Sequence, residues 1–161
     1  MFIFAGSLFL IGEHLENHGT LSAPEGNIGL LAAKEVLVST RPDGRALSAA
    51  VRLPSGSVDN SGRLIADAGT IALQARVVNQ NGLVQADSVR EHNGVIELVA
   101  SSAINLGPGS VLSAAGDAAG PSDAGRITLK SAKLRLKSFL LRLGFNYVGP
   151  IDGHDLEIGR A

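Results

Sequence analysis

The side chains most able to do acid–base chemistry lie close together near the end of the sequence. Asp152, His154 and Asp155 place an imidazole among carboxylates, and such groups act as general acids and bases in many enzymes. Catalysis also requires a substrate cleft and further positioned groups, which the short tail holding these residues cannot supply. We therefore expect no catalytic residue in this chain, and His154 is the one candidate that the pattern singles out.

A second set of chemically able residues lies near the start. His14 and His18 are four positions apart, with Glu13 and Glu16 beside them, and on a helix this spacing would suggest a metal site. In an extended segment, residues four apart share a face but lie about 13 Å from each other, too far to bind one ion. Because we expect this segment to be extended, we interpret it as a solvated wall and expect no metal.

Composition limits the remaining chemistry. The chain has no cysteine, which excludes disulfides, thiolate catalysis and thiolate-bound zinc. No P-loop, dinucleotide-binding or nucleophile-elbow pattern occurs, so we expect no cofactor. The net charge is −1 and the sequence shows no basic stripe, so nucleic acid is not an expected partner. Four aspartates lack the spacing of calcium-binding β-rolls and are interpreted as turn residues: Asp67, Asp87, Asp117 and Asp123.

The apolar N-terminus is too short to cross a bilayer, so we expect no membrane insertion. It also lacks the basic start and the clear cleavage site of a signal peptide. We expect Ser7–Ile11 to form a first strand instead.

A recurring phrase indicates which fold must position all these residues. The phrase is Gly-x-Ile-x-Leu-x-Ala or Ser, and its four copies span residues 26–32, 69–75, 94–100 and 125–131. Apolar residues at every second position predict strands with one buried face, and the glycine predicts a turn. Strand–turn units that recur in this way are typical of a solenoid, in which each coil buries its apolar row on its neighbours. The aromatic content of only 4% fits a narrow bore filled by aliphatic side chains.

The phase of these phrases predicts the core. We expect these side chains to point into the bore: Leu21, Ile28, Leu30, Leu64, Ile71, Leu73, Val84, Ile96, Leu98, Ile127 and Leu129. Small residues are expected where the wall bends: Ala23, Ala32, Ala66, Ala75, Ala86 and Ala100. A second phrase, Asn-x-Gly-x-Leu-x-Ala, begins at Asn17 and again at Asn60. We expect these two amides to stack coil on coil and to bond turn backbone that would otherwise be buried unpaired.

Two segments depart from the repeat. Residues 39–57 contain Pro42-Asp43-Gly44, a strong turn signal, followed by a strand expected at 46–53. We interpret them as an excursion from the wall or one irregular coil. After Ser131 the pattern stops, and residues 134–143 show helical spacing with glycine next, where a helix C′ residue belongs. The sequence therefore predicts an all-β repeat domain over 1–131 and a tail over 132–161 with a short helix that caps the last coil.

Residues 7–131 resemble the filamentous-haemagglutinin-like exoproteins that are secreted by the two-partner route. The likeness is carried by residues 15–23, 26–32 and 58–75. It implies a right-handed parallel β-helix that is exported through an outer-membrane transporter. Such a segment usually belongs to a long adhesin, which is extracellular or at the cell surface and contacts host or neighbouring cells.

A short stretch of the tail resembles a different family. Residues 143–156, with Gly-Pro-Ile-Asp-Gly-His-Asp at 149–155, are similar to a signature of 1-deoxy-D-xylulose-5-phosphate synthase. That family uses thiamine diphosphate in isoprenoid synthesis, and the resemblance implies an active-site position for His154. Its cofactor and magnesium motif has no counterpart in this chain. We therefore expect an adhesive, non-enzymatic β-helix segment, with a fused fragment of this synthase as the alternative.

Overall fold

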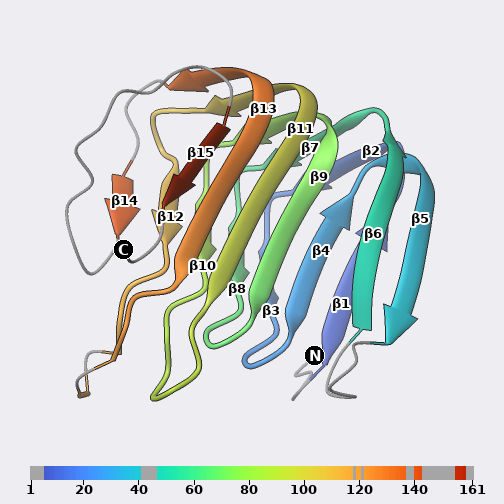
Figure 1. Ribbon diagram of the computed structural model, residues 1–161. Coiled ribbons are helices and arrows are strands. Elements are labelled where there is room, and N and C mark those ends of the chain that lie inside the picture. The colour runs from blue at the N-terminus through green and yellow to red at the C-terminus, as the bar shows by residue number, and fades with distance from the viewer. Residues whose placement is uncertain are drawn as a thin grey trace.

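The computed structural model describes residues 6–40, 47–117, 119–120, 122–136, 140–142 and 155–158. All regular elements in these ranges are β-strands, most of them paired in parallel, and the same ranges contain no helix. The long strands stand side by side in one sheet, with a row of short strands behind it (Figure 1).

The larger sheet has eight strands. They are β1 (Ser7–Ile11), β2 (His14–Asn17), β4 (Asn27–Leu31), β7 (Ser57–Asn60), β9 (Thr70–Gln80), β11 (Val95–Leu106), β13 (Arg126–Leu136) and β15 (Asp155–Ile158). The main path runs β1-β4-β9-β11-β13-β15, while β7 joins β2 to the second half of β9. All pairings in this sheet are parallel except that of β13 with β15.

The smaller sheet has five short strands in the order β14-β12-β10-β8-β3. They are β3 (Thr20–Ser22), β8 (Arg63–Ile65), β10 (Leu83–Gln85), β12 (Val111–Ser113) and β14 (Leu140–Arg142). The chain alternates between the two sheets, and each strand lies beside the equivalent strand of the preceding pass. We use the word "pass" for one such traverse of both sheets.

Residues of the repeated phrase pair with their own equivalents. Ile71 is in register with Ile28 on one side and with Ile96 on the other, and Ile127 continues the row on β13. The leucine two positions later forms a second row in the same way: Leu30, Leu73, Leu98 and Leu129. Because direct neighbours in a sheet share a face, each row is a continuous apolar stripe.

The core lies between the two sheets. Leu64, Val84 and Leu112 of the smaller sheet pack in one cluster with the two rows of the larger sheet. Every predicted bore residue is buried except Leu21, which is partly buried on β3 at the edge of its sheet. The six alanines predicted at the bends are all buried as well.

At Gly69 and Gly125, the glycine that opens the phrase is required by close contact between passes. A Cβ atom on Gly69 would lie 2.0 Å from the carbonyl oxygen of Gly26, and one on Gly125 would lie 2.1 Å from that of Gly94. The same two carbonyls accept hydrogen bonds from the next residues along, Thr70 and Arg126, at 3.0 Å each. A side chain at either glycine would therefore push neighbouring passes apart.

The excursion predicted after the first pass is an antiparallel hairpin of β5 (Ala33–Thr40) and β6 (Leu47–Pro54). The predicted turn at 42–44 lies outside the described residues. The hairpin forms a sheet of its own, and β6 approaches β4 and β9 of the larger sheet.

The helix predicted over 134–143 is wrong for the residues that the structure describes there. β13 continues through Leu134 to Leu136, and residues 140–142 form β14. Leu134 pairs with Ile104, and Leu136 pairs with Leu106. The sequence of this segment alternates apolar and basic residues as well as matching a helical spacing. The available edge of β11 stabilises the extended form, because it satisfies the backbone hydrogen bonds. The domain boundary at 131 stays a prediction.

The register predicts how charge is tolerated in β9. Leu73→Asp would place a carboxylate at a fully buried position and should lower the free energy of unfolding by about 3–5 kcal/mol. Thr70→Asp, whose side chain is partly exposed on the opposite face, should cost less than about 1 kcal/mol. Urea denaturation followed by circular dichroism measures both, and equal losses would contradict the phase.

Candidate functional site

The acid–base cluster predicted in the tail lies mostly outside the described residues. This holds for Asp152 and for the candidate His154. Asp155 is the first residue of β15, where its backbone is in register with Lys130. A catalytic role for His154 thus stays a hypothesis from the sequence alone.

The two N-terminal histidines each face a serine of the next pass. The Nδ1 atom of His14 lies 3.3 Å from the Oγ of Ser57, and the Nδ1 of His18 lies 2.6 Å from the Oγ of Ser61. In the part of the chain that the structure describes, no group of three or more His, Cys, Asp or Glu residues could hold a metal ion. The histidines therefore act here as hydrogen-bonding groups between passes.

Ser61, His18 and Glu16 form a chain that resembles the serine–histidine–carboxylate order of acyl-transfer sites. The Nε2 of His18 lies 3.4 Å from a carboxylate oxygen of Glu16, completing the chain that begins at Ser61. Sequence reasoning missed this cluster because Ser61 is 43 residues from His18. A signal was available, since Ser61 and His18 hold the same position in the two Asn-x-Gly phrases.

The surroundings of this cluster do not suit acyl transfer. The backbone N–H groups of Ser61 and Gly62 could have formed an oxyanion hole, but both donate to the carbonyl of Asn17, at 2.9 and 3.0 Å. The side chains of His18 and Glu16 are 72% and 68% exposed, so water surrounds them. Electrostatic stabilisation of an oxyanion depends on preorganised donors in a water-excluded site. The cluster is better explained as a hydrogen-bonded surface turn.

A buried amide ladder lies behind this turn. The Nδ2 of Asn17 donates to the Oδ1 of Asn60, and the Nδ2 of Asn60 donates to the Oε1 of Gln80, both at 2.8 Å. The ladder ends where the Nε2 of Gln80 donates to the carbonyl of Gly82 at 2.8 Å. The predicted stacking of Asn17 on Asn60 is confirmed. Gln80 holds the third position of the ladder. Its neighbours in the sequence are Asn79 and Asn81.

A second polar row runs along the outer surface of the same strands. The Nδ2 of Asn79 donates to the Oδ1 of Asp59, and the Nδ2 of Asn105 donates to the Oδ1 of Asn79, both at 2.6 Å. Arg135 follows Asn105 in register, and all four side chains line a hollow of about 480 Å³. The row ties successive passes together at the surface and offers both acidic and basic groups to solvent.

Asp67 and Asp87, predicted as turn residues, also join passes. The carboxylate of Asp67 accepts from the Nε2 of Gln85 at 3.0 and 3.1 Å and from the backbone N–H of Asp87 at 3.0 Å. Asp87 in turn accepts from the Oγ of Ser113 at 2.6 Å. These carboxylates satisfy donors of the next pass, and their role is structural.

Asp117 carries the one resolved pKa shift among the described groups. Its pKa is lowered, mainly because the backbone N–H of Ala119 donates to the carboxylate at 2.8 Å, and then because the N–H of Arg90 does so at 3.0 Å. Asp117 is partly exposed, and the shift marks a hydrogen-bonded turn.

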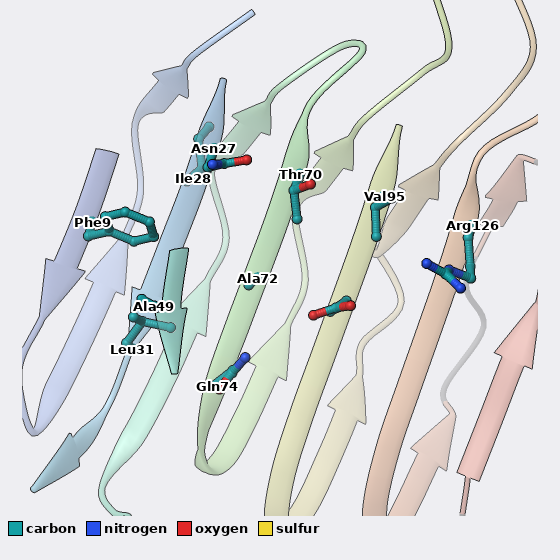
Figure 2. A pocket seen from close by; sticks show the side chains of 11 residues that line it. Phe9, Asn27, Ile28, Leu31, Ala49, Thr70, Ala72, Gln74, Val95 and Arg126 are labelled. Atoms are coloured by element: carbon teal, nitrogen blue, oxygen red, sulfur yellow. The ribbon is translucent and has the colours of Figure 1, made fainter. Parts of the chain in front are cut away.

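A groove lies on the outer face of the larger sheet, beside the β5–β6 hairpin. Thr70, Ala72 and Gln74 alternate along β9 with the buried residues and therefore form the floor. The groove has a volume of about 280 Å³ and reaches from Phe9 on β1 to Arg126 on β13. Figure 2 shows its side chains on successive strands.

The groove walls combine apolar and charged groups. Phe9, Leu31 and Ala49 make one end apolar, while Glu97 and Arg126 place opposite charges toward the other end. Leu31 is almost fully buried although it faces away from the core cluster. The described part of this surface therefore offers both apolar and polar contacts to solvent.

Comparison of the chain with family models, curated proteins and solved structures finds no match. No helix in the described ranges is long and apolar enough to span a membrane. The resemblances to haemagglutinin-like exoproteins and to the synthase therefore stay predictions.

The amide ladder predicts a large effect of one buried substitution. Asn60→Ala, at a position that is 1% exposed, would leave the Oε1 of Gln80 without its donor and the Nδ2 of Asn17 with only the carbonyl of Gly19, at 3.3 Å. Because unsatisfied buried polar groups cost about 1–3 kcal/mol each, unfolding free energy should fall by roughly 2–4 kcal/mol. Asn93→Ala, at an exposed position, should be within about 0.5 kcal/mol of the parent in the same urea titration.

The Ser61 cluster predicts no serine-dependent hydrolysis. The chain and its Ser61→Ala variant should release p-nitrophenol from p-nitrophenyl acetate at the same rate, because the two nearby amides are occupied. An initial burst that is present in the parent and lost in Ser61→Ala would contradict this.

Proposed function

We propose that the passes are coils of a right-handed parallel β-helix, and that the protein is a structural, adhesive segment of a secreted haemagglutinin-like surface exoprotein. The main support is the in-register pairing of equivalent residues across successive passes, as in Ile28, Ile71 and Ile96. Such nearest-neighbour stacking is typical of solenoids, which present long walls for binding.

The outer wall supports a binding role. The groove under the hairpin combines an apolar end with Glu97 and Arg126, and the row of Asp59, Asn79 and Asn105 lies on another part of the wall. Surfaces of this mixed kind suit reversible contacts with another surface. The proposed partners are a host or neighbouring cell and, in a longer parent, an outer-membrane two-partner transporter.

The proposal includes no catalysis, and the nearest arrangement to a catalytic site supports this. Ser61 has a histidine at 2.6 Å, but the amides that would stabilise an oxyanion are already bonded to Asn17. The alternative, a synthase fragment that binds thiamine diphosphate, rests on the tail sequence alone. Titration calorimetry with thiamine diphosphate and Mg²⁺ separates the two, because saturable binding that is lost in His154→Ala would favour the synthase.

Adhesion through the groove predicts a difference between two tryptophan variants. Fluorescently labelled protein should bind to cell surfaces, and Ala72→Trp, which fills the groove floor, should reduce the bound fraction several-fold. Arg63→Trp, at an exposed position on the smaller sheet, is the matched control and should bind like the parent. Flow cytometry measures the bound fraction, and equal binding by both variants would exclude the groove as the contact surface.

A further inference from the structure

Two asparagine–glycine pairs occur in the sequence, Asn81-Gly82 and Asn93-Gly94. In such a pair the backbone nitrogen of the glycine can attack the side-chain amide carbon of the asparagine, because glycine has no Cβ to hinder the approach. The attack requires a backbone that can rotate and a glycine N–H that is not held by another group. Both asparagines are exposed, so the backbone contacts of each pair decide which one reacts.

The pair Asn81-Gly82 is held by both neighbouring passes. Its two N–H groups donate to the carbonyl of Asn60, at 2.8 and 3.1 Å. A Cβ atom on Gly107 would collide with the Oδ1 of Asn81, so the asparagine side chain packs directly on the backbone of the next pass. Rotation of this pair would break all of these contacts.

The pair Asn93-Gly94 lacks the contact that holds its equivalents. Gly94 opens the third copy of the repeated phrase, and in the other three copies the opening glycine donates its N–H to the carbonyl of an alanine. These bonds join Gly26 to Ala23 at 3.0 Å, Gly69 to Ala66 at 2.8 Å and Gly125 to Ala114 at 2.9 Å. Within the described part of the chain, the N–H of Gly94 has no hydrogen-bond partner.

A longer turn explains this difference. Two residues separate Ala66 from Gly69, whereas seven separate Ala86 from Gly94. Val89 and His92 exchange two backbone hydrogen bonds, at 2.9 and 3.0 Å, and so close a small loop of their own. The next backbone donor that is held is Val95, which bonds to the carbonyl of Gly69 at 2.9 Å. Asn93 and Gly94 therefore form a short link between two fixed points.

We propose that Asn93 is a site of spontaneous deamidation, and that the fold selects it over Asn81. The nitrogen of Gly94 bonds to the Cγ of Asn93, the Cγ–Nδ2 bond breaks, and ammonia leaves with the former amide proton of Gly94. Water then opens the five-membered imide at either carbonyl, which gives aspartate or isoaspartate. Both products add one carboxylate to the turn beside Glu91. The inference is independent of the proposed adhesive function.

Mass spectrometry of the folded protein tests the selection. Trypsin places Asn81 in residues 77–90 and Asn93 in residues 91–126, so the exchange of an amide for a carboxyl group is measured separately at each pair. During incubation at mildly alkaline pH, Asn93 should convert at least about tenfold faster than Asn81, because reaction at Asn81 requires the hydrogen bond of Gly82 to break. In guanidinium chloride, which removes these contacts, the two rates should become similar.

Three outcomes would overturn the proposal. They are equal rates in the folded protein, no conversion at Asn93, and a preference for Asn93 that is unchanged in denaturant, since that preference would come from the flanking sequence and not from the fold. Asn93→Gln assigns the position, because glutamine would have to form a larger ring. It should remove the mass gain from residues 91–126, and a gain that persists would belong to Asn105 and would also contradict the assignment. Asn81→Gln is the matched control and should leave the rate at Asn93 unchanged.

Discussion

Parallel, in-register pairing between equivalent residues is the constraint on which the rest of this structure depends. A parallel ladder aligns each residue with its counterpart, so an apolar residue stays buried only if the next pass has one at the same position. Ile71 satisfies this condition toward both Ile28 and Ile96. The same alignment brings Asn60 between Asn17 and Gln80, where each amide donates to the next. Hydrophobic and polar interactions are thus set by one geometric rule.

Much of this could be predicted from the sequence, because the signal recurs. The alternation in Gly-x-Ile-x-Leu fixed the buried face of four strands, and the burial of Leu73, Leu98 and Leu129 confirms that phase. The amide contact between Asn17 and Asn60 was predictable for the same reason. Gln80 was not, since its amide reaches the ladder through a longer side chain and its phrase lacks asparagine at the expected position.

Features that depend on distant pairing were harder to predict. Leu134 and Leu136 fit a helix by spacing and a strand by alternation, and only the pairing of β13 with β11 selects the strand. The contact of His18 with Ser61 crosses 43 residues; the sequence singled out His18 only as a possible metal ligand and did not single out Ser61. The groove beside the hairpin depends on where β6 lies over β4 and β9, which no local pattern encodes.

The hairpin has a consequence for how such a chain can change over time. Asn17 and Asn60 occupy equivalent positions although 43 residues separate them, whereas Asn60 and Gln80 are 20 residues apart. The extra chain leaves the wall at β5 and returns at β6 without disturbing the alignment on either side. The register therefore accommodates an insertion of this length at the bend, whereas a Cβ at Gly69 or Gly125 would meet a carbonyl oxygen at about 2 Å. A longer or different loop at the bend would therefore leave the paired strands of the larger sheet in the same register.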